Sequence, residues 1–279
     1  MPRLGAHRYG KSEVRLVKLT RGPERHVLRD LTVDVMLEGD FEAVHTSGDN
    51  TGLVATDTMR NVVYALAAEH PLDSLPAFGA TLVGHFLGYP RVTGASVGIR
   101  EHPWQRLPGP GDGHPQAWQR GAGGTRVEEL SGDAGGTRHT GGVEDLLVLR
   151  SAGSAFEGFD RDRFATLPET ADRILATAVA ARWEYSDAGG DLEASWTQVR
   201  DRLLTAFTDH RSPSVQFTLH RMGEAVIGAH PEIERIHITL PNRHHLPFDV
   251  SRFGVEDRGE VFHATTEPFG LIEATVERA

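Results

Sequence analysis

Leu31, Val33, Val35 and Leu37 alternate with other residues within the segment Val27–Glu38, and this pattern constrains the fold of the 279-residue chain more than any other feature. The apolar residues between Leu31 and Leu37 fall on every second position, which is the period of a β-strand with one buried face. The preceding segment, Ser12 to Thr20, is also extended in character, and the turn residues of RGPERH lie between the two. The sequence therefore predicts an antiparallel hairpin.

Helical periodicity follows this hairpin. Apolar residues from Met59 to Leu66 recur at intervals of three and four, which predicts a helix ending near Pro71. A second helix is predicted from Asp73 to Leu87, and Val92 to Arg106 returns to extended character. Residues 108–142 are rich in glycine, proline and polar side chains, so we expect long hairpin loops or a linker there.

The second half of the chain repeats this order of elements without repeating the residues. Its predicted extended segments are Asp145–Arg150, Ala178–Tyr185, Ile236–Leu240 and a last one beginning at Phe248–Val250, and its predicted helices are Leu192–Asp209 and one that starts near Ser214. We therefore expect an α+β fold of two tandem units, residues 1–140 and 141–279, each an antiparallel sheet with paired helices on one face. Because sheet edges need partners, we also expect the sheets to close into a barrel on oligomerisation.

The composition excludes several classes of protein. With 29 basic and 39 acidic residues the formal net charge is -10, which disfavours nucleic acid and anionic membrane surfaces as partners. The chain has no cysteine, so thiol nucleophiles, disulfides and cysteine-ligated metal are excluded. No apolar run approaches the length of a membrane span, and MPRLGAHRYGK lacks the apolar core of a secretory signal, so we expect a cytoplasmic protein.

The string GAHRYGKS, from Gly5 to Ser12, fits the phosphate-loop formula G-x-x-x-x-G-K-[ST]. Such a loop needs a strand before it and a helix after it. Here only four residues precede Gly5, and the residues after Lys11 alternate as a strand. The spacing therefore argues against a nucleotide loop and, taken alone, favours an ordinary solvated role for Lys11.

Fifteen histidines raise the possibility of a metal site. However, the chain has no H-E-x-x-H motif, and His244 and His245 would point to opposite sides of an extended segment. His230 and His237 lie in different predicted elements. Most of the histidines are expected on the surface, and a cluster formed in space stays open as an alternative.

Several polar positions allow both a structural and a functional interpretation. Thr56 and Asp57 are placed to cap a helix, yet the same helix end offers free N–H groups to an anionic or carbonyl-rich ligand. Glu169 and Arg173 are spaced for an ion pair within a helix, or Arg173 presents its planar guanidinium to a ligand with two adjacent acceptors.

Three further residues have the same ambiguity. Phe156 is expected in the core, or as a platform for stacking. Asn242 and His244 directly follow a predicted strand, where turn residues are common and where catalytic groups also occur.

Seven sequence blocks, spread over nearly the whole chain, resemble the urate oxidase (uricase) family, which has the tunnelling fold. They are YGKSEVRLVK, NTGLVATDTMRNVVYALA, SAFEGFDRDRFATLPETADRIL, EASWTQVRDRLLTAF, SPSVQFTL, LPNRHHLPFDVS and FGLIEATVER. The resemblance implies that Lys11 and Thr56 form a proton relay and that His244 is catalytic. It also implies substrate contacts from Thr56, Asp57, Phe156, Arg173, Val215, Gln216 and Asn242.

The resemblance further implies oxidation of urate by O2 and water to 5-hydroxyisourate and hydrogen peroxide, with no metal and no organic cofactor. A homotetramer with active sites shared between subunits is implied as well. The tail ERA lacks the Ser-Lys-Leu peroxisomal address, which favours a bacterial cytoplasmic enzyme. Two alternatives stay open: another tunnelling-fold enzyme acting on a pterin or purine, and a non-catalytic purine-binding oligomer.

Overall fold

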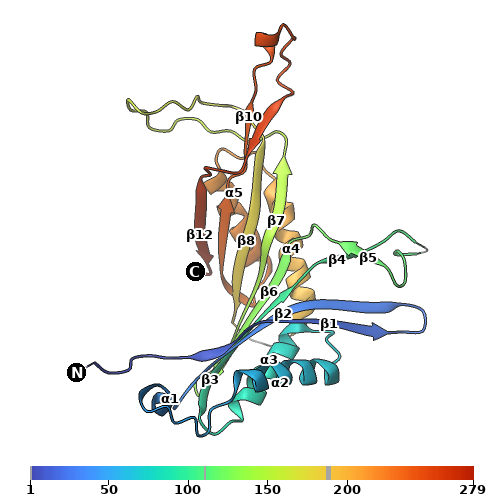
Figure 1. The fold of residues 1–279 in the computed structure, drawn as a ribbon. Helices are drawn as coiled ribbons and strands as arrows, with labels where there is room; N and C mark the ends of the chain where they lie inside the picture. Colours follow the sequence, from blue (N-terminus) through green and yellow to red (C-terminus); the bar gives the residue numbers. More distant parts are fainter. Residues whose placement is uncertain (1, 110, 187–189) are drawn as a thin grey trace. The chain divides into compact units, whose positions relative to one another are not determined.

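The computed structural model describes residues 2–109, 111–186 and 190–279, which form an α+β fold built on antiparallel strands (Figure 1). The chain divides into two compact units. Unit 1 comprises Met1–Gly142 and Glu184–Trp196, and unit 2 comprises Val143–Trp183 and Thr197–Ala279. The predicted boundary near residue 140 between tandem units of one fold, and the closure of a barrel, stay predictions.

Unit 1 is a strand layer in the order β1-β2-β3-β6-β7. The pairs β1/β2, β2/β3 and β3/β6 are antiparallel, and the predicted first hairpin is confirmed. The elements are β1 (Tyr9–Arg21), β2 (His26–Gly39), α1 (Glu42–Thr46), α2 (Thr56–Glu69), α3 (Leu75–Leu87), β3 (Val92–Glu101), β4 (Trp104–Arg106), β5 (Trp118–Arg120), β6 (Thr125–Asp133) and the first residues of β7 (Gly136–Arg150).

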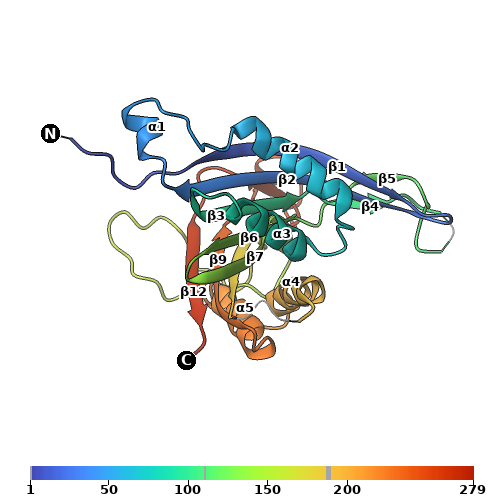
Figure 2. The ribbon, with the colours of Figure 1, turned by 90° about the horizontal axis from the view of Figure 1, so that it is seen from below.

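The alternating residues of β2 are buried because α2 and α3 cover that face of unit 1 (Figure 2). Leu31 and Leu37 are fully buried, in contact with an apolar cluster that includes Phe78 and Leu82 of α3. Gly79 allows the close approach of α3 to β6, because a Cβ atom there would lie 2.5 Å from Cδ1 of Leu130.

The prediction of loops or a linker over residues 108–142 is wrong for much of that segment. Strands β5, β6 and the start of β7 lie within it, while Pro110 is outside the described residues. The cause is the polar composition of these strands: Arg126, Glu128 and His139 are buried although they are polar or charged. A pattern that assigns only apolar residues to the interior does not detect strands of this kind.

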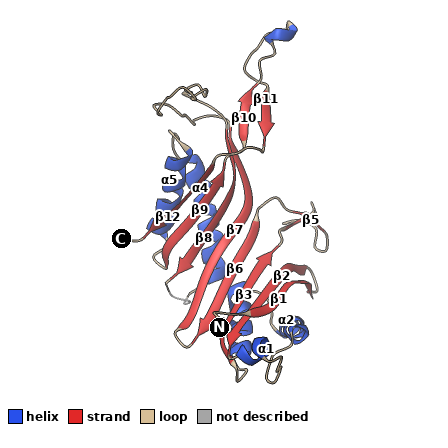
Figure 3. Cartoon of the chain, turned by 60° about the vertical axis from the view of Figure 1, so that its left-hand side comes forward, coloured by secondary structure: helices blue, strands red, loops and turns tan. Residues whose placement is uncertain are grey.

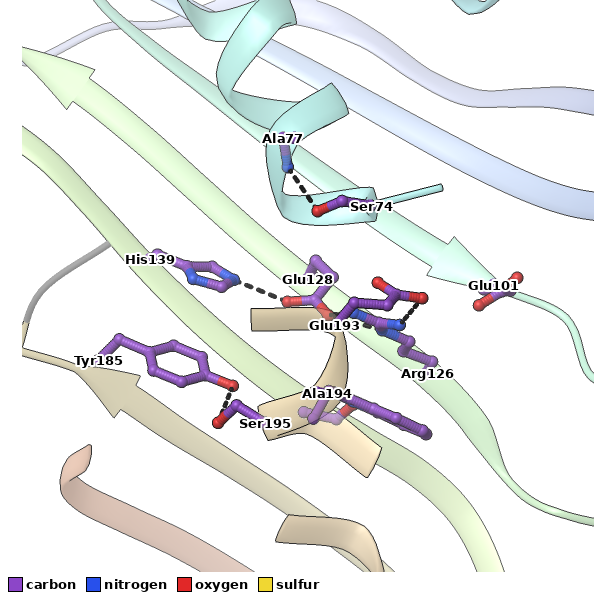
Figure 4. Close-up of polar contacts among 12 residues, drawn as sticks. Ser74, Ala77, Glu101, Arg126, Glu128, His139, Tyr185, Glu193, Ala194 and Ser195 are labelled. Carbon is purple, nitrogen blue, oxygen red and sulfur yellow. Dashed lines mark hydrogen bonds and ion pairs between the residues drawn. The ribbon is translucent and has the colours of Figure 1, made fainter. Parts of the chain in front are cut away.

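Those buried polar side chains form a network within unit 1, which we call the Arg126 network (Figure 4). Arg126 contacts Glu128 at 2.6 Å and Glu193, in the first turn of α4, at 2.7 Å. Oε2 of Glu128 also forms a hydrogen bond with Nε2 of His139, at 2.7 Å. Arg29 forms an ion pair with Glu193 at 2.9 Å. Each buried charge therefore has an opposite charge within contact distance, as burial requires.

Unit 2 has the strand order β7-β8-β9-β12, with α5 packed against β9 and β12. Strands β9 and β12 are antiparallel. The elements are the end of β7, β8 (Leu175–Tyr185, shared with unit 1 at its last residues), α4 (Leu192–Thr208, likewise shared at its start), α5 (Val215–Ala229), β9 (Ile233–Pro241), β10 (His244–Pro247), a 3₁₀ turn η1 (Ser251–Phe253), β11 (Phe262–Thr265) and β12 (Leu271–Glu277).

Strands β10 and β11 form a separate antiparallel ribbon that extends from the rest of unit 2 (Figure 3). The prediction of a strand beginning at Phe248–Val250 is wrong, because these residues lie between β10 and η1. Within the described part of the chain, no helix has the length and apolarity to cross a membrane.

Candidate functional site

A cavity of about 450 Å³ lies in unit 2, between the segment before β8 and the start of the β10–β11 ribbon. This volume is in the range of small-molecule sites. Three of the predicted site residues line it: Arg173, Asn242 and His244. The other lining residues are Ser151, Leu167, Pro168, Glu169, Thr170, Asp172, Ile174, His245, Leu246, Pro247, Gly259 and Phe262.

Arg173 is a half-buried cation without a carboxylate partner among the described residues. Its Nε is buried and makes no hydrogen bond in that set. Burial lowers the pKa of its guanidinium, and no negative charge opposes this effect. The predicted ion pair with Glu169 is wrong: residues 169–173 are not helical, and Glu169 Oε1 instead accepts from Gly158 N at 3.0 Å. The guanidinium is thus available to an anionic ligand.

The backbone holds Arg173 beside Phe156. Phe156 and Thr170 exchange two main-chain hydrogen bonds, of 2.8 and 3.1 Å, and Arg173 N donates to Ser154 O at 2.7 Å. The guanidinium carbon then lies 5.2 Å from the centre of the Phe156 ring. A planar anion that stacks on this ring would place its edge at the guanidinium.

Sequence reasoning missed Asp172, which supports this arrangement. Its Oδ1 accepts hydrogen bonds from Gly153 N at 2.6 Å and Ser154 N at 3.1 Å. An aspartate beside a candidate arginine carries no local signal for such a role, because its partners are 18 and 19 residues away.

Asn242 and His244 lie where β9 ends and β10 begins, so the predicted strand before them is confirmed. Asn242 N donates to Gly270 O at 2.8 Å, and Oγ1 of Thr177 in β8 donates to Pro241 O at 2.9 Å. Hydrogen bonds to two other parts of unit 2 therefore fix the main chain at Pro241 and Asn242. Nδ2 of Asn242 is 3.3 Å from Nδ1 of His244. Since an amide nitrogen donates, Nδ1 accepts and a neutral His244 ring carries its proton on Nε2.

Val215 and Gln216 form the first turn of α5. The predicted start of this helix is confirmed: Ser214 is its N-cap, and its side chain accepts from Phe217 N at 3.2 Å. Val215 is buried and Gln216 is exposed. Neither residue, nor Phe156, is among the described residues that line the cavity.

Lys11 lies in unit 1 at a β-bulge, where the register of β1 against β2 shifts between Lys11 and Val14. Glu13, within the bulge, has φ of 59°, a left-handed conformation that is unfavourable for glutamate. Its N–H donates to Asp34 Oδ1 at 2.8 Å. Bulges reorient side chains next to functional sites, and Lys11 is half-buried here rather than fully solvated.

Thr56 and Asp57 begin α2 but do not cap it, so the cap prediction is wrong. The N-cap is Ala55, which supplies no side-chain acceptor, and Asp57 pairs with Arg60 at 2.7 Å. Among the described residues no side chain caps this helix end, and a ligand at its N–H groups stays a prediction.

Tyr9, two residues before Lys11, was not predicted to matter. Its hydroxyl donates to Val54 O and accepts from Val54 N, both at 3.0 Å, and Val54 lies two residues before Thr56. Tyr9 therefore ties the segment that carries Lys11 to the segment that carries Thr56.

The predicted site residues are thus divided between the units. Lys11, Thr56 and Asp57 belong to unit 1, and the others belong to unit 2. Within residues 2–109, 111–186 and 190–279, no three histidine or acidic side chains are grouped as metal ligands.

Comparison with known proteins identifies a family. The sequence model of the uricase family matches residues 7–129 and 139–273. The uricase of Arthrobacter globiformis is 45% identical over 276 residues, 99% of this chain and 90% of that protein, and the uricase of Dictyostelium discoideum is 38% identical over 278 residues, 98% and 96% of the two chains.

Solved structures agree with the sequence relatives. The crystal structure of the Arthrobacter globiformis uricase matches with a TM-score of 0.94 and 44% identity, covering 100% of this chain and 96% of that one. A uricase from Bacillus fastidious shares the fold with a TM-score of 0.85 at 23% identity, covering 98% and 94%. The chain belongs to the uricase family.

Proposed function

We propose that this protein oxidises urate with O2 and water to 5-hydroxyisourate and hydrogen peroxide, without a metal or an organic cofactor. Urate loses two electrons, O2 gains two electrons and two protons, and water supplies the oxygen of the new hydroxyl group. Membership of the uricase family supports the substrate. The observation that carries the proposal is Arg173, a half-buried cation beside an aromatic ring and without a carboxylate partner in the described chain.

Binding follows from the shape and charge of urate, which is a planar anion with adjacent acceptors at its edge. The guanidinium of Arg173 and the carboxamide of Gln216 would fix that edge, with Val215 alongside. The Phe156 ring would fix the plane by stacking. The N-terminal turn of α2, at Thr56 and Asp57, would supply N–H groups and a favourable dipole to the remaining polar atoms.

The chemistry would be proton movement around an electron-rich purine. Lys11 would accept a proton through Thr56, after which the deprotonated purine reduces O2 and forms a hydroperoxide adduct. Loss of peroxide and addition of water would then give the product. Asn242, with Thr56, would position dioxygen or water over the ring, and His244, 3.3 Å from Asn242, would act in the proton transfers.

The active protein would be a homotetramer in which each site is shared between subunits. Two observations support association: large apolar side chains such as Phe253 and Val255 near η1 are exposed, and β1 and β12 are the outermost strands of their units. Dissociation is then expected to abolish activity. A monomer that oxidises urate at the rate of the assembled protein would contradict the shared site.

The test is to mix purified, metal-stripped protein with urate and follow ultraviolet absorbance, O2 and hydrogen peroxide together. The proposal predicts one O2 consumed and one peroxide released per urate. Binding of urate without O2 consumption, or turnover that requires added zinc, would contradict it.

A further inference from the structure

One buried serine, Ser212, joins three of the segments of unit 2 that carry proposed urate contacts: those of Phe156, Arg173 and Gln216. Ser212 N donates to Gly153 O at 2.8 Å, and Ser212 O accepts from Ala155 N at 2.7 Å. Ser154, between these two partners, accepts from Arg173 N at 2.7 Å. Ser154 and Ser212 are fully buried. The main chain of Ser212 thus bonds directly to the segment that carries Phe156. Ser154, in that same segment, bonds in turn to the segment that carries Arg173.

The side chain of Ser212 continues this connection into α5. Its hydroxyl donates to Ser214 O at 2.9 Å, at the helix N-cap. Thr218, one turn along α5 and fully buried, donates from Oγ1 to Ser212 Oγ at 2.8 Å. Nε2 of His210 is 2.9 Å from Thr218 Oγ1.

These contacts have a fixed direction. A carbonyl oxygen only accepts, so the single hydroxyl hydrogen of Ser212 is used at Ser214 O. Thr218 then donates to Ser212, and Nε2 of His210 is a further polar neighbour of the Thr218 hydroxyl. The series Thr218, Ser212 and Ser214 therefore runs from donor to acceptor and ends at the helix turn that carries Gln216.

We propose that Ser212 and Thr218 are positioning residues for urate: their hydroxyls hold the Gln216 turn in register with Phe156 and Arg173. This rests on the proposed function, since it concerns the same ligand. Neither side chain is part of the cavity lining, so both act through the main chain that they anchor. Small displacements of positioning groups have large effects on binding and rate.

The experiment measures the Kd of urate in the absence of O2, so that no turnover occurs, for wild type and three variants. Thr218→Val keeps the side-chain shape and removes both hydrogen bonds, and Thr218→Ser restores the hydroxyl. Thr205→Val is the control, because Thr205 is an exposed threonine of α4 whose hydroxyl bonds within its own helix, to Asp201 O. The inference predicts a Kd about tenfold higher for Thr218→Val, the wild-type Kd for Thr205→Val, and a Kd near wild type for Thr218→Ser.

A purely structural role for Thr218 would lower the melting temperature and the fraction of folded protein but leave the Kd per folded site unchanged. That result would overturn the inference. If Thr218→Val does not fold, Ser212→Ala, which keeps the main-chain bonds, is judged by the same ratio of Kd values. The two proposals fail separately: wild type that binds urate anaerobically but consumes no O2 contradicts the proposed function, whereas a wild-type Kd in Thr218→Val contradicts only the positioning role.

Discussion

Two buried or half-buried arginines, one in each unit, have opposite surroundings. Arg126 in unit 1 contacts Glu128 and Glu193 within 2.7 Å. Burial lowers the pKa of Arg126, but the charges of Glu128 and Glu193 outweigh this effect and raise it overall. Arg173 in unit 2 has no such carboxylate in the described chain, and burial alone lowers the pKa of its guanidinium.

We propose that this difference separates a structural cation, Arg126, from a functional one, Arg173. The free energy cost of burying Arg126 is offset within the folded chain, so that charge completes the fold. The cost of desolvating Arg173 is not offset by a carboxylate among the described residues, so an anionic ligand could neutralise this charge. The predictions below test whether this distinction holds.

Lys11 extends the comparison to a lysine. Its amino group makes no ion pair or hydrogen bond within residues 2–109, 111–186 and 190–279, whereas Lys18 on the same strand donates to Ala67 O at 2.8 Å and to His70 O. If unpaired cations mark function, Lys11→Ala should lower kcat by about 10²-fold or more while urate still binds. Thr56→Ala should have a similar effect, because Thr56 is proposed to pass the proton to Lys11. Steady-state oxygen uptake measures this.

Lys18→Ala is the matched control for that prediction. It removes a lysine that satisfies carbonyl groups at the end of α2, so it should lower the melting temperature and leave kcat unchanged. Unchanged turnover in Lys11→Ala or in Thr56→Ala would remove that residue from the relay.

Arg173→Met should raise the KM for urate by about 100-fold or more, because a bidentate, charge-assisted contact is lost. Its stability should be unchanged or higher, since an uncompensated half-buried charge is replaced by an apolar chain. Urate titrations and thermal melts measure the two effects. A melting temperature that falls steeply would show that Arg173 has a structural partner after all.

Arg126→Met should show the reverse. Glu128 and Glu193 would keep their charges without a partner, and the free energy of unfolding should fall by about 3–5 kcal/mol. The KM for urate should stay within about twofold of wild type, since Arg126 is not one of the proposed urate contacts. Denaturant titration together with steady-state kinetics separates these outcomes, and an unaltered unfolding midpoint would argue against the Arg126 network as a source of stability.

The smallest expected effect is a pH dependence from Glu193. Burial raises the pKa of Glu193. Arg126 and Arg29 lower it by more than burial raises it, so the net pKa is below the usual value of 4.5. A depressed carboxyl pKa stabilises the fold above the unfolded pKa, and this contribution is lost as the pH falls below about 4.5 through the folded pKa. Glu193→Gln should therefore be less stable at pH 7 and lose less stability between pH 5 and 3, as urea unfolding at several pH values would show. Equal slopes in the two proteins would contradict this.

The sequence predicted the apolar part of the fold well. Leu31 to Leu37, Met59 to Leu66 and the start of α5 at Ser214 carry local signals of period or capping, and the strands and helices lie there. Strand β6 and the start of β7 were missed because their inward positions include Arg126, Glu128 and His139, whose burial depends on partners elsewhere in unit 1, from Arg29 to Glu193.

The site shows the same limit. The place of Asn242 and His244 after a strand is a local feature, but it allowed both a turn and a catalytic role, and only the family resemblance favoured the second. The juxtaposition of Arg173 with Phe156 comes from bonds between segments 14 or more residues apart, and local spacing instead suggested a helical pair with Glu169. The family resemblance identified these residues, but it did not indicate Tyr9, Asp172, Ser212 or Thr218, whose partners are defined only in the folded chain.

The most direct measurement is the Kd of urate, determined without oxygen, for Arg173→Met and Arg126→Met side by side under conditions where both are folded. The contrast between the two arginines predicts a loss of affinity of about 100-fold or more in Arg173→Met and the wild-type Kd in Arg126→Met. Equal affinities in the two variants, or the wild-type Kd in Arg173→Met, would contradict the claim that the uncompensated guanidinium is the anion site.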